Sequence, residues 1–360
     1  MTEPTSTTPD NGRIGFEQLQ QFITLAMHKL GLPQADAATV GRLMAEAELQ
    51  GSDGHGVIRL LPYARRIRAG GLNLTPNITV VQERAGMALL DGDNGMGHLV
   101  MERAAHMAIE KAKNCGIGWV GSRLSNHAGP ASLYARMPMA QNMIGLYFAV
   151  GNANHLPPWG GLDMLLSTNP IAVAVPAGEE PPVVLDMATT VAAYGKVKAK
   201  AQRGEMMPEG WMIDRQGNPL LDPKRAEEGF LMPIGGYKGY GLSLIVGLLA
   251  GTLNGAAMGK QVIDFNHDDV TTTTTGQAVM AIDLSAFGDV DAFKARVDQL
   301  VRELRGSERM PGVERIWLPG EQSHAKREAN VRDGMQLPAP LRQQLDAFAL
   351  ELGLPKLSEL

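Results

Sequence analysis

The sequence predicts an α/β protein in which helical terminal segments pack together and a mixed α/β segment is inserted between them. Apolar residues recur at helical spacing near both ends of the chain. From residue 117 to residue 284, short apolar strands alternate with helices, which is typical of an α/β domain. We therefore expect one mainly helical domain from 14–116 and 285–360, an α/β domain over 117–284, and a disordered tail at 1–13.

The N-terminal region is expected to be helical, with one pair of strands. Apolar spacing predicts a helix over Phe16–Leu30, and Pro33 is suited to begin a second helix that continues to Glu48. The other expected elements are a helix from about Val57 to Arg68, two strands within Val80–Asp91, and an amphipathic helix over Gly97–Cys115 closed by Gly116.

The middle and C-terminal regions contain the alternating pattern. The strands expected there are Ile117–Ser122, Met143–Val150, Asn169–Pro176, Val183–Asp186 and Gln277–Leu284. The expected helices are Pro130–Gln141, Thr189–Arg203, a glycine-rich helix at 239–259, Val290–Arg305 and Ala339–Leu352. Gly204–Pro223 and the run that ends in Thr271–Thr275 are expected to be loops, because they are rich in Pro, Gly, Asp or Thr.

The composition argues against several classes of protein. The formal net charge is −5 and no basic run occurs, so we expect no nucleic-acid partner. Cys115 is the single cysteine, which excludes an intrachain disulfide and fits a reducing, cytoplasmic location. No HExxH, CxxC or GxSxG pattern occurs, so neither a metal site nor a serine hydrolase is expected. The uncharged stretch Gly239–Gly259 is long enough for a membrane span, but its glycines and polar residues favour a buried helix.

A histidine between two glycines is the first candidate for chemistry. In Gly54-His55-Gly56, His55 precedes Arg59 by four residues, at the expected start of a helix. Residues at this spacing share one face of a helix. An imidazole can move a proton and a guanidinium can grip a carboxylate, so the pair suggests an enzyme for a small carboxylate. The alternatives are a capping or core histidine and a surface ion pair.

A second histidine follows a strand. Asn126, His127 and Gly129 lie between the expected strand Ile117–Ser122 and the helix that Pro130 begins. The carboxyl end of a strand and the amino end of a helix are places where anions and ligands bind. We therefore consider His127 a candidate site residue.

Three further positions remain open between functional and structural roles. Thr168 could orient a carboxylate or simply close a turn, and Asp186 could hold a histidine tautomer or cap a helix. Lys238, among glycines, suits a phosphate or carboxylate, unless its stem only packs along the surface. The stretch Gly95-Met96-Gly97 lacks the third glycine of a dinucleotide-binding loop, so a Rossmann domain is not expected.

Taken together and in order, these segments resemble the malate/L-lactate dehydrogenase family of the second type. This family is unrelated to the Rossmann lactate and malate dehydrogenases. It includes ureidoglycolate dehydrogenase, sulfolactate dehydrogenase, diketogulonate reductase and Δ1-piperideine-2-carboxylate reductase. The matching segments are Gly54–Leu60, Asn126–Gly129, Pro158–Gly161, Thr168–Ala172, Asp186–Thr189, Pro208–Trp211, Lys238–Leu242 and Leu318–Glu321. Each is weak alone, but eight in order over about residues 15 to 335 are specific.

The resemblance implies a non-Rossmann fold and a homodimer that uses NAD or NADP to oxidise or reduce a small 2-hydroxy or 2-oxo carboxylic acid. It gives the helical domain the substrate and dimer contacts and the α/β domain the cofactor. It implies catalytic roles for His55, His127 and Asp186, with Asp186 completing a relay to His55, and substrate contacts for Arg59 and Thr168. The implied cofactor-lining residues are His127, Ala128, Gly129, Pro130, Ala131, Asp186, Met187, Ala188, Lys238, Pro319, Gly320 and Glu321.

The chain departs from the family pattern at three places. Many members have Ser-His-Gly where this chain has Gly54-His55-Gly56, and many have His-Lys-Gly where it has Tyr237-Lys238-Gly239. His155, in an unusual run before Pro158, is a further candidate for a substrate contact. The missing serine removes a hydroxyl from the relay and counts against an NADPH-dependent reductase of a cyclic imino acid. That reductase is kept as an alternative, together with a cofactor-binding protein with impaired catalysis.

Overall fold

The computed structural model describes residues 12–360, and these residues form two compact units. Residues up to Leu61 belong with Ser323–Leu360, and Pro62–Gln322 form the second unit. The first unit thus combines both ends of the chain, with the second inserted between them. The expected tail at 1–13 lies largely outside the described residues; of its last two residues, Arg13 belongs to a strand, β1 (Arg13–Ile14).

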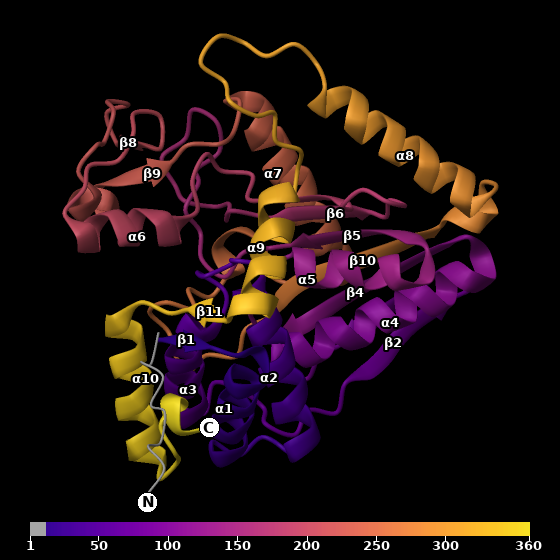
Figure 1. Cartoon of the computed structure of the whole chain (residues 1–360). Coiled ribbons are helices and arrows are strands. Elements are labelled where there is room, and N and C mark those ends of the chain that lie inside the picture. Colours follow the sequence, from indigo (N-terminus) through magenta and orange to yellow (C-terminus); the bar gives the residue numbers. More distant parts are fainter. Residues whose placement is uncertain (1–11) are drawn as a thin grey trace, which may run out of the picture. The chain divides into compact units, whose positions relative to one another are not determined.

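The first unit is helical, as its apolar spacing predicts. It contains α1 (Phe16–Lys29), α2 (Gln34–Leu49), most of α9 (Glu321–Asp333) and α10 (Ala339–Leu352). Leu19, Phe22 and Ile23 on one side of α1 are buried, and α2 follows Pro33. β1 pairs with β11 (Met335–Gln336), which joins the two ends of the chain (Figure 1).

A seven-stranded sheet organises the second unit. Its order is β2-β3-β4-β10-β5-β6-β7, and every neighbouring pair is antiparallel except β3 and β4. The strands are β2 (Thr79–Arg84), β3 (Met87–Asp91), β4 (Ile117–Ser125), β5 (Met143–Ala149), β6 (Ile171–Val175), β7 (Val183–Met187) and β10 (Thr275–Asp283). The late strand β10 lies between β4 and β5, so the sheet closes only after most of the chain is made.

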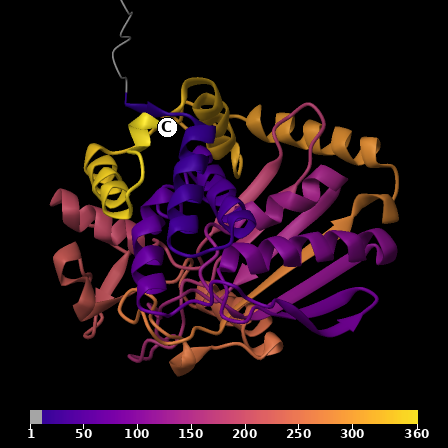
Figure 2. The same ribbon diagram turned by 90° about the horizontal axis from the view of Figure 1, so that it is seen from below.

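Helices cover both faces of this sheet. On one face, α4 (Gly97–Cys115) approaches Gly118 so closely that an added Cβ would overlap the Ala108 carbonyl oxygen, and α5 (Ser132–Arg136) approaches Gly145 in the same way. On the other face, α7 (Tyr237–Ala250) packs Val246 against Phe148 and Ala278. Figure 2 shows α4 running beside the long central strands.

Along the chain, the two units are divided at other residues than the expected domain boundaries. Residues 62–116 and 285–322, assigned to the helical domain above, belong to the unit that holds the sheet. One reason is that β3 pairs with β4 and carries β2 with it. Another is that α8 (Val290–Arg305) is attached to the β6–β7 hairpin, where the Asp298 carboxylate accepts the N–H groups of Gly178, Glu179 and Glu180.

Several predicted elements need correction. The helix expected from Thr189 begins only at Tyr194, as α6 (Tyr194–Arg203), because the Thr189 N–H and hydroxyl both donate to the Thr168 carbonyl. The glycine-rich helix ends at Ala250 rather than at 259, and the helix expected over Pro130–Gln141 is α5 followed by a 3-10 turn at Met137–Gln141. The predicted loop Gly204–Pro223 contains β8 (Met212–Asp214), which pairs with β9 (Gly229–Leu231) beside α6 (Figure 1).

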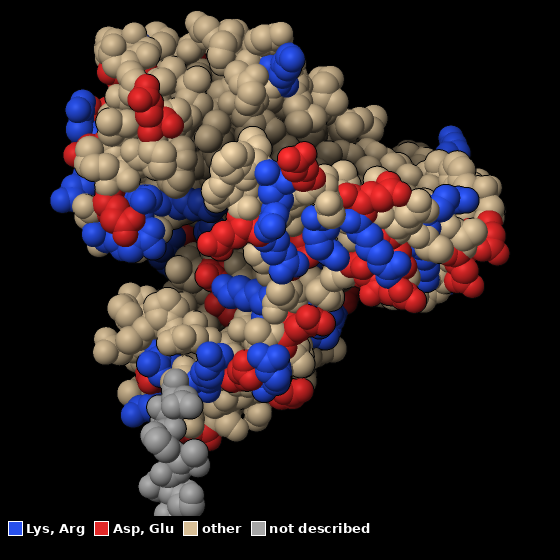
Figure 3. Space-filling view, turned by 45° about the horizontal axis from the view of Figure 1, so that its top comes forward, with Lys and Arg blue, Asp and Glu red and all other residues tan. Residues whose placement is uncertain are grey.

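The described part of the chain contains neither a candidate membrane-spanning helix nor a candidate metal site. No helix among residues 12–360 is long and apolar enough to cross a membrane. No group of three or more His, Cys, Asp or Glu side chains in the same range could hold a metal ion. On the face in Figure 3, basic and acidic side chains are intermixed.

A buried arginine anchors one loop of the second unit. Arginine side chains are mostly solvated in proteins, but that of Arg66 on α3 (Leu60–Arg68) is fully buried. Its guanidinium donates to the Asp268 and Thr271 carbonyl oxygens and lies 5.2 Å from the ring centre of Phe265. Arg65 adds an ion pair with Asp269 at 2.5 Å. The threonine-rich loop is therefore attached to α3.

We predict that Arg66→Leu destabilises the protein by about 2–4 kcal/mol, because two partly buried hydrogen bonds from the guanidinium to carbonyl oxygens are lost. Arg68→Leu, at an exposed position on the same helix, should change stability by less than about 0.5 kcal/mol. Urea unfolding of both variants measures the difference. Equal stability of Arg66→Leu and the wild type would contradict the anchoring role.

Candidate active site

The His55 segment is a tight turn in the first unit. After α2 ends at Leu49, the His55 N–H donates to the Ser52 carbonyl at 2.7 Å, and a 3-10 turn, η1 (Val57–Arg59), leads into α3. His55 therefore lies before the helix, so a shared helix face does not describe its relation to Arg59. Instead, Arg59 returns to the turn, and its Nε donates to the Gly54 carbonyl oxygen at 2.8 Å.

Burial and charge keep His55 neutral. Desolvation of the half-buried ring, with a smaller contribution from the Arg59 charge, lowers the pKa of His55 to about 4. At neutral pH the imidazole can therefore donate one hydrogen bond and accept another. An anionic ligand beside Arg59 would offset the cation and make His55 a stronger base.

A buried glutamate supports this turn. The side chain of Glu48, near the end of α2, is 6% exposed, and its Oε2 accepts the Val57 N–H at 2.9 Å. A Cβ on Gly56 would overlap the same oxygen. Burial raises the pKa of Glu48 to about 7, opposed by the Val57 hydrogen bond. The turn between α2 and η1 is thus packed on a carboxylate.

His127 in the second unit is oriented by two donors. It follows β4 at Ser125, and Gly129, with φ of 82°, turns the chain toward α5. The Gly129 N–H points at Nδ1 from 3.4 Å, which makes Nδ1 an acceptor, so the Tyr63 hydroxyl donates to it at 2.6 Å. The neutral ring then carries its proton on Nε2, as the hydrogen-bond network assigns it.

Aromatic rings pack around this hydrogen bond. Phe265 lies with its ring centre 6.1 Å from those of both His127 and Tyr63. His98, fully buried on α4, meets the Tyr63 ring edge-on at 5.7 Å. Burial lowers the pKa of His98 to about 3, so it stays neutral. The surroundings of the Tyr63–His127 pair are therefore mainly apolar.

Asp186 connects β7 to α5. Its Oδ2 accepts the backbone N–H of Ser132 at 2.9 Å, just after Ala131. The side chain is exposed, yet the protein around the carboxyl group displaces enough water to raise the pKa of Asp186, against the Ser132 hydrogen bonds. The hydrogen bond to Ser132 favours a role in positioning α5. The relay from Asp186 to His55 stays a prediction.

The Leu318–Glu321 turn lies along β7 as well. The Val184 N–H donates to the Pro319 carbonyl at 3.0 Å, and Gly320 is so close to β7 that a Cβ would contact the Val184 carbonyl oxygen. Glu321 is buried and pairs with Arg305 and Arg315. The structure thus brings the Pro319–Gly320 turn, Asp186 and the start of α5 together at one edge of the sheet. Met187 and Ala188 continue this chain segment.

Thr168 and His155 lie in the segment between β5 and β6. The Thr168 carbonyl accepts two hydrogen bonds from Thr189, which favours a structural role for its backbone. The His155 ring stacks on Tyr194 at 4.3 Å between ring centres, and burial lowers the pKa of His155 to about 4. Asp264, Lys198 and His267 are the charged or titratable groups that act on it.

Lys238 lies in the first turn of α7. Its side chain is exposed, and the N-cap residue Gly236 has no side chain with which to accept the first N–H groups of this 14-residue helix. Unpaired helix N–H groups beside a lysine can hold an anionic phosphate. This arrangement fits the phosphate role that the resemblance implies for Lys238.

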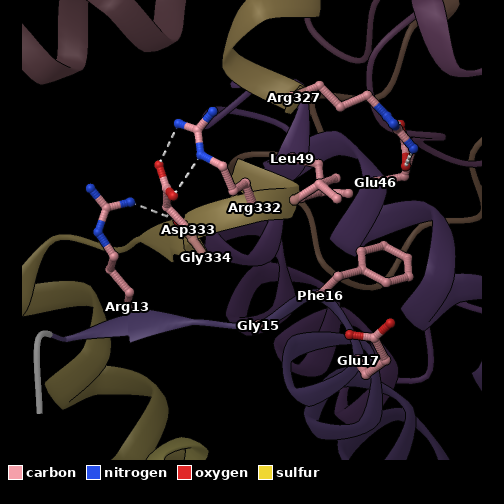
Figure 4. Close-up of a pocket in the computed structure, with 11 residues that line it drawn as sticks. Arg13, Gly15, Phe16, Glu17, Glu46, Leu49, Arg327, Arg332, Asp333 and Gly334 are labelled. Carbon is pink, nitrogen blue, oxygen red and sulfur yellow. Dashed lines mark hydrogen bonds and ion pairs between the residues drawn. The ribbon is translucent and has the colours of Figure 1, made fainter. Parts of the chain in front are cut away.

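A pocket in the first unit has a different character. It lies beside the β1–β11 junction and is lined by three arginines and three acids, together with apolar residues and glycines (Figure 4). Arg327 pairs with Glu46 and Arg332 with Asp333, so these charges compensate one another. The pocket contains neither His55 nor Arg59. We therefore do not assign the candidate chemistry to it.

Three residues at these sites escaped the sequence analysis. Tyr63 follows Arg59 by four residues, so helical spacing from a suspected site residue was a usable signal. Glu48 is an acid near the end of a predicted helix, seven residues before the glycine-flanked histidine. Phe265 gave no signal, because it lies in a polar loop whose attachment to α3 depends on the fold.

Comparison with known proteins identifies the family of this chain. A family model described as malate/L-lactate dehydrogenase matches residues 14–346. The chain belongs to this family. It is 37% identical to a malate dehydrogenase of Pyrococcus horikoshii, covering 95% of this chain and 96% of the relative. It is 36% identical to an L-sulfolactate dehydrogenase of Methanocaldococcus jannaschii, with 94% and 96% covered.

The fold agrees with solved structures of the family. The structure of a malate dehydrogenase from Entamoeba histolytica superimposes with a TM-score of 0.91 at 27% identity, covering 95% of this chain and 98% of that chain. The predicted α/β, non-Rossmann fold of this family is therefore confirmed, and so is the family recognised from its segments.

Two neighbouring glycines should respond differently to substitution. Gly56→Ala would push the Glu48 carboxylate away from the Val57 N–H, and should destabilise the protein by about 1–3 kcal/mol. Gly54→Ala meets no atom within 4 Å and should stay within about 0.5 kcal/mol of the wild type. Thermal unfolding of the pair is the measurement, and a larger loss in Gly54→Ala would reverse our account of the turn.

Proposed function

We propose that the chain catalyses reversible hydride transfer between a nicotinamide dinucleotide and C2 of a small 2-hydroxy or 2-oxo carboxylic acid. Membership of the malate/L-lactate dehydrogenase family supports the reaction, and the relatives named malate and sulfolactate dehydrogenase support the class of substrate. The structural observation that carries the proposal is the Tyr63–His127 hydrogen bond at 2.6 Å.

His127 is the proposed proton carrier. In reduction, Nε2 would give its proton to the 2-oxo oxygen while the Tyr63 hydroxyl proton moves to Nδ1, so that the ring stays neutral and the Tyr63 oxygen regains a proton from solvent; in oxidation both transfers run in reverse. A base oriented by a third group is the arrangement that such proton transfer requires. Phe265 and Tyr63 pack near the half-buried ring and cover part of it, which strengthens its hydrogen bonds.

Arg59 and His55 are the proposed substrate-binding pair. Because the Arg59 Nε is used by the Gly54 carbonyl, its two terminal nitrogens would bind the substrate carboxylate. The neutral His55 ring would hydrogen-bond the same anion, whose charge also raises the basicity of the imidazole. Thr168 and His155 remain proposed substrate contacts.

The proposed cofactor-binding residues fit a dinucleotide. The uncapped first turn of α7 with Lys238 suits the phosphates. His127–Ala131, Asp186–Ala188 and Pro319–Glu321 are the other segments that we propose to line the cofactor. When bound, the nicotinamide supplies or accepts the hydride. NAD and NADP both remain candidates.

One screen tests the function as a whole. The purified chain is mixed with each cofactor and with malate, lactate, sulfolactate, ureidoglycolate and a cyclic imino acid, together with the corresponding oxo acids, while nicotinamide absorbance is followed. We expect turnover of a 2-hydroxy or 2-oxo acid. Cofactor binding without any redox change would instead support the impaired, binding-only alternative, and turnover restricted to the imino acid would support the reductase alternative.

His127→Ala should lower kcat by about 10²- to 10⁴-fold, because proton transfer at the reacting oxygen is lost. Tyr63→Phe keeps the ring but removes the donor to Nδ1, and should lower kcat by about tenfold. Steady-state kinetics with the substrate found in the screen measure both effects. Full turnover by His127→Ala would rule out this proton carrier.

His55→Ala should lower turnover by about 10²-fold as well.

Arg59→Lys should raise KM for carboxylate substrates by about tenfold or more, because an ammonium group cannot form two parallel hydrogen bonds to a carboxylate. The Michaelis constant of the same substrate is the readout, with Arg68→Lys as the matched control on the adjoining helix. An unchanged KM would exclude Arg59 as the carboxylate ligand.

We propose that the active form is a homodimer that uses the outer face of α7. After its first turn this helix is almost entirely apolar, and Ile245 and Leu248 on it are 52% and 40% exposed. A helix of this kind is normally covered on every side. Light scattering should give the dimer mass for the wild type and a lower mass for Ile245→Glu. A monomeric wild type would exclude the dimer, and a dimeric Ile245→Glu would place its interface elsewhere.

A further inference from the structure

Glu48 combines burial with a direct contact to the backbone of the His55 turn. It is the penultimate residue of α2, and its side chain is 6% exposed although a carboxylate prefers water. Retaining an acid in such a place requires a compensating interaction. That interaction is the 2.9 Å hydrogen bond from the Val57 N–H to Oε2.

The bonded N–H belongs to the first residue of η1. Val57 stands between His55 and Arg59, so fixing its backbone also fixes the residues on either side. The next residue toward the N-terminus, Gly56, has no side chain, and the Glu48 oxygen occupies the space where a Cβ would stand. Two independent features, a hydrogen bond and a close packing contact, therefore connect Glu48 to the turn.

We infer that Glu48 is a positioning residue, whose buried carboxylate holds the His55–Arg59 turn in the form that binds the substrate carboxylate. This inference rests on the proposed function of that turn, and it names the residue that keeps the turn ordered. Glu48 acts through Val57 and Gly56, so it should affect KM more than kcat.

The contact should depend on pH in the physiological range. The charged or titratable groups on the segments packed against Glu48 are Asp53 and His55 in the turn, Arg59 in η1, Glu46 on α2 itself, and Lys326 and Arg327 on α9. Asp53 opposes the charge of Glu48 and Lys326 supports it, while burial raises the pKa of Glu48 to about 7. Above that pH the carboxylate is a charged, stronger acceptor, and below it the neutral acid holds Val57 more weakly.

The direction of the pH effect on KM follows from the two protonation states of Glu48. KM for the carboxylate substrate should be lowest above about pH 7 and should rise about fivefold as the pH falls through that value, since a hydrogen bond to a neutral group is weaker. In the same range the Val57 amide should exchange its hydrogen faster than solution chemistry alone predicts.

Two variants of the full-length protein test the inference. Glu48→Gln keeps an acceptor oxygen but cannot ionise, so its KM should equal the low-pH value of the wild type at every pH. Glu48→Leu removes the acceptor and should raise KM further, by about tenfold or more. In both variants KM should change by a larger factor than kcat. Glu46→Gln, which loses only the pair with Arg327, is the matched control and should follow the wild-type profile.

Hydrogen exchange of the peptide around residues 50–60 is the second readout, and it does not require turnover. We expect pH-dependent protection in the wild type and in Glu46→Gln, and its loss in Glu48→Gln. If Glu48→Gln keeps the wild-type KM profile and protection, the inference is overturned, even where Glu48→Leu fails to fold. A lower melting temperature with an unchanged pH profile also overturns it, because it would show a purely structural role.

Failure of the proposed function gives a different pattern. If the wild type turns over none of the hydroxy or oxo acids, the kinetic arm fails for every variant alike. The exchange arm still reports whether Glu48 orders the turn, so the two hypotheses are separated.

Discussion

The hydrogen bond from Tyr63 to Nδ1 of His127 sets the arrangement on which the second unit's chemistry depends. It joins α3 to the loop after β4, and at 2.6 Å it fixes which nitrogen of the imidazole accepts. The bond is in turn held by apolar neighbours, since Phe265 and His98 pack against the Tyr63 ring. Arg66 holds the loop that supplies Phe265, at the expense of burying a cation.

The turn in the first unit is built on another principle. There a carboxylate replaces the usual side-chain cap of a helix start, and a glycine makes room for it. The positive end of a helix favours a negative group, but burial opposes the charge. The pKa of Glu48 is therefore about 7. A site built in this way keeps its shape only while the carboxylate and Val57 remain in contact.

The spacing of apolar residues predicted those helices that bury one apolar face. The bounds of α4, α8 and α10 agree with the sequence expectation, because apolar spacing and a terminal glycine or proline mark their ends. α9 was missed because only Glu321 in it is buried, which leaves no apolar stripe. The helix expected from Thr189 starts five residues late, because tertiary hydrogen bonds to Thr168 compete with helix formation.

Some residues of the proposed site could be selected from the sequence, because reactive side chains there coincide with the ends of strands. His127 and Asp186 stand at strand ends, and the family segments indicated Lys238 and Pro319–Glu321. Tyr63, Glu48 and Arg66 were not found, since each acts through partners far away or on another element. The sequence does not distinguish a buried arginine from solvated ones nearby. The carbonyl oxygens that bind it come from a distant loop, and only the folded structure brings them close.

Cys115 gives this molecule a practical property. It is the single cysteine of the chain, exposed at the last residue of α4, beside the left-handed Gly116 that ends the helix. A thiol-reactive fluorophore would therefore attach at one defined place, on a helix that packs along the central strands, without removal of any other sulfhydryl. The native chain is in this sense already prepared for distance measurements by energy transfer.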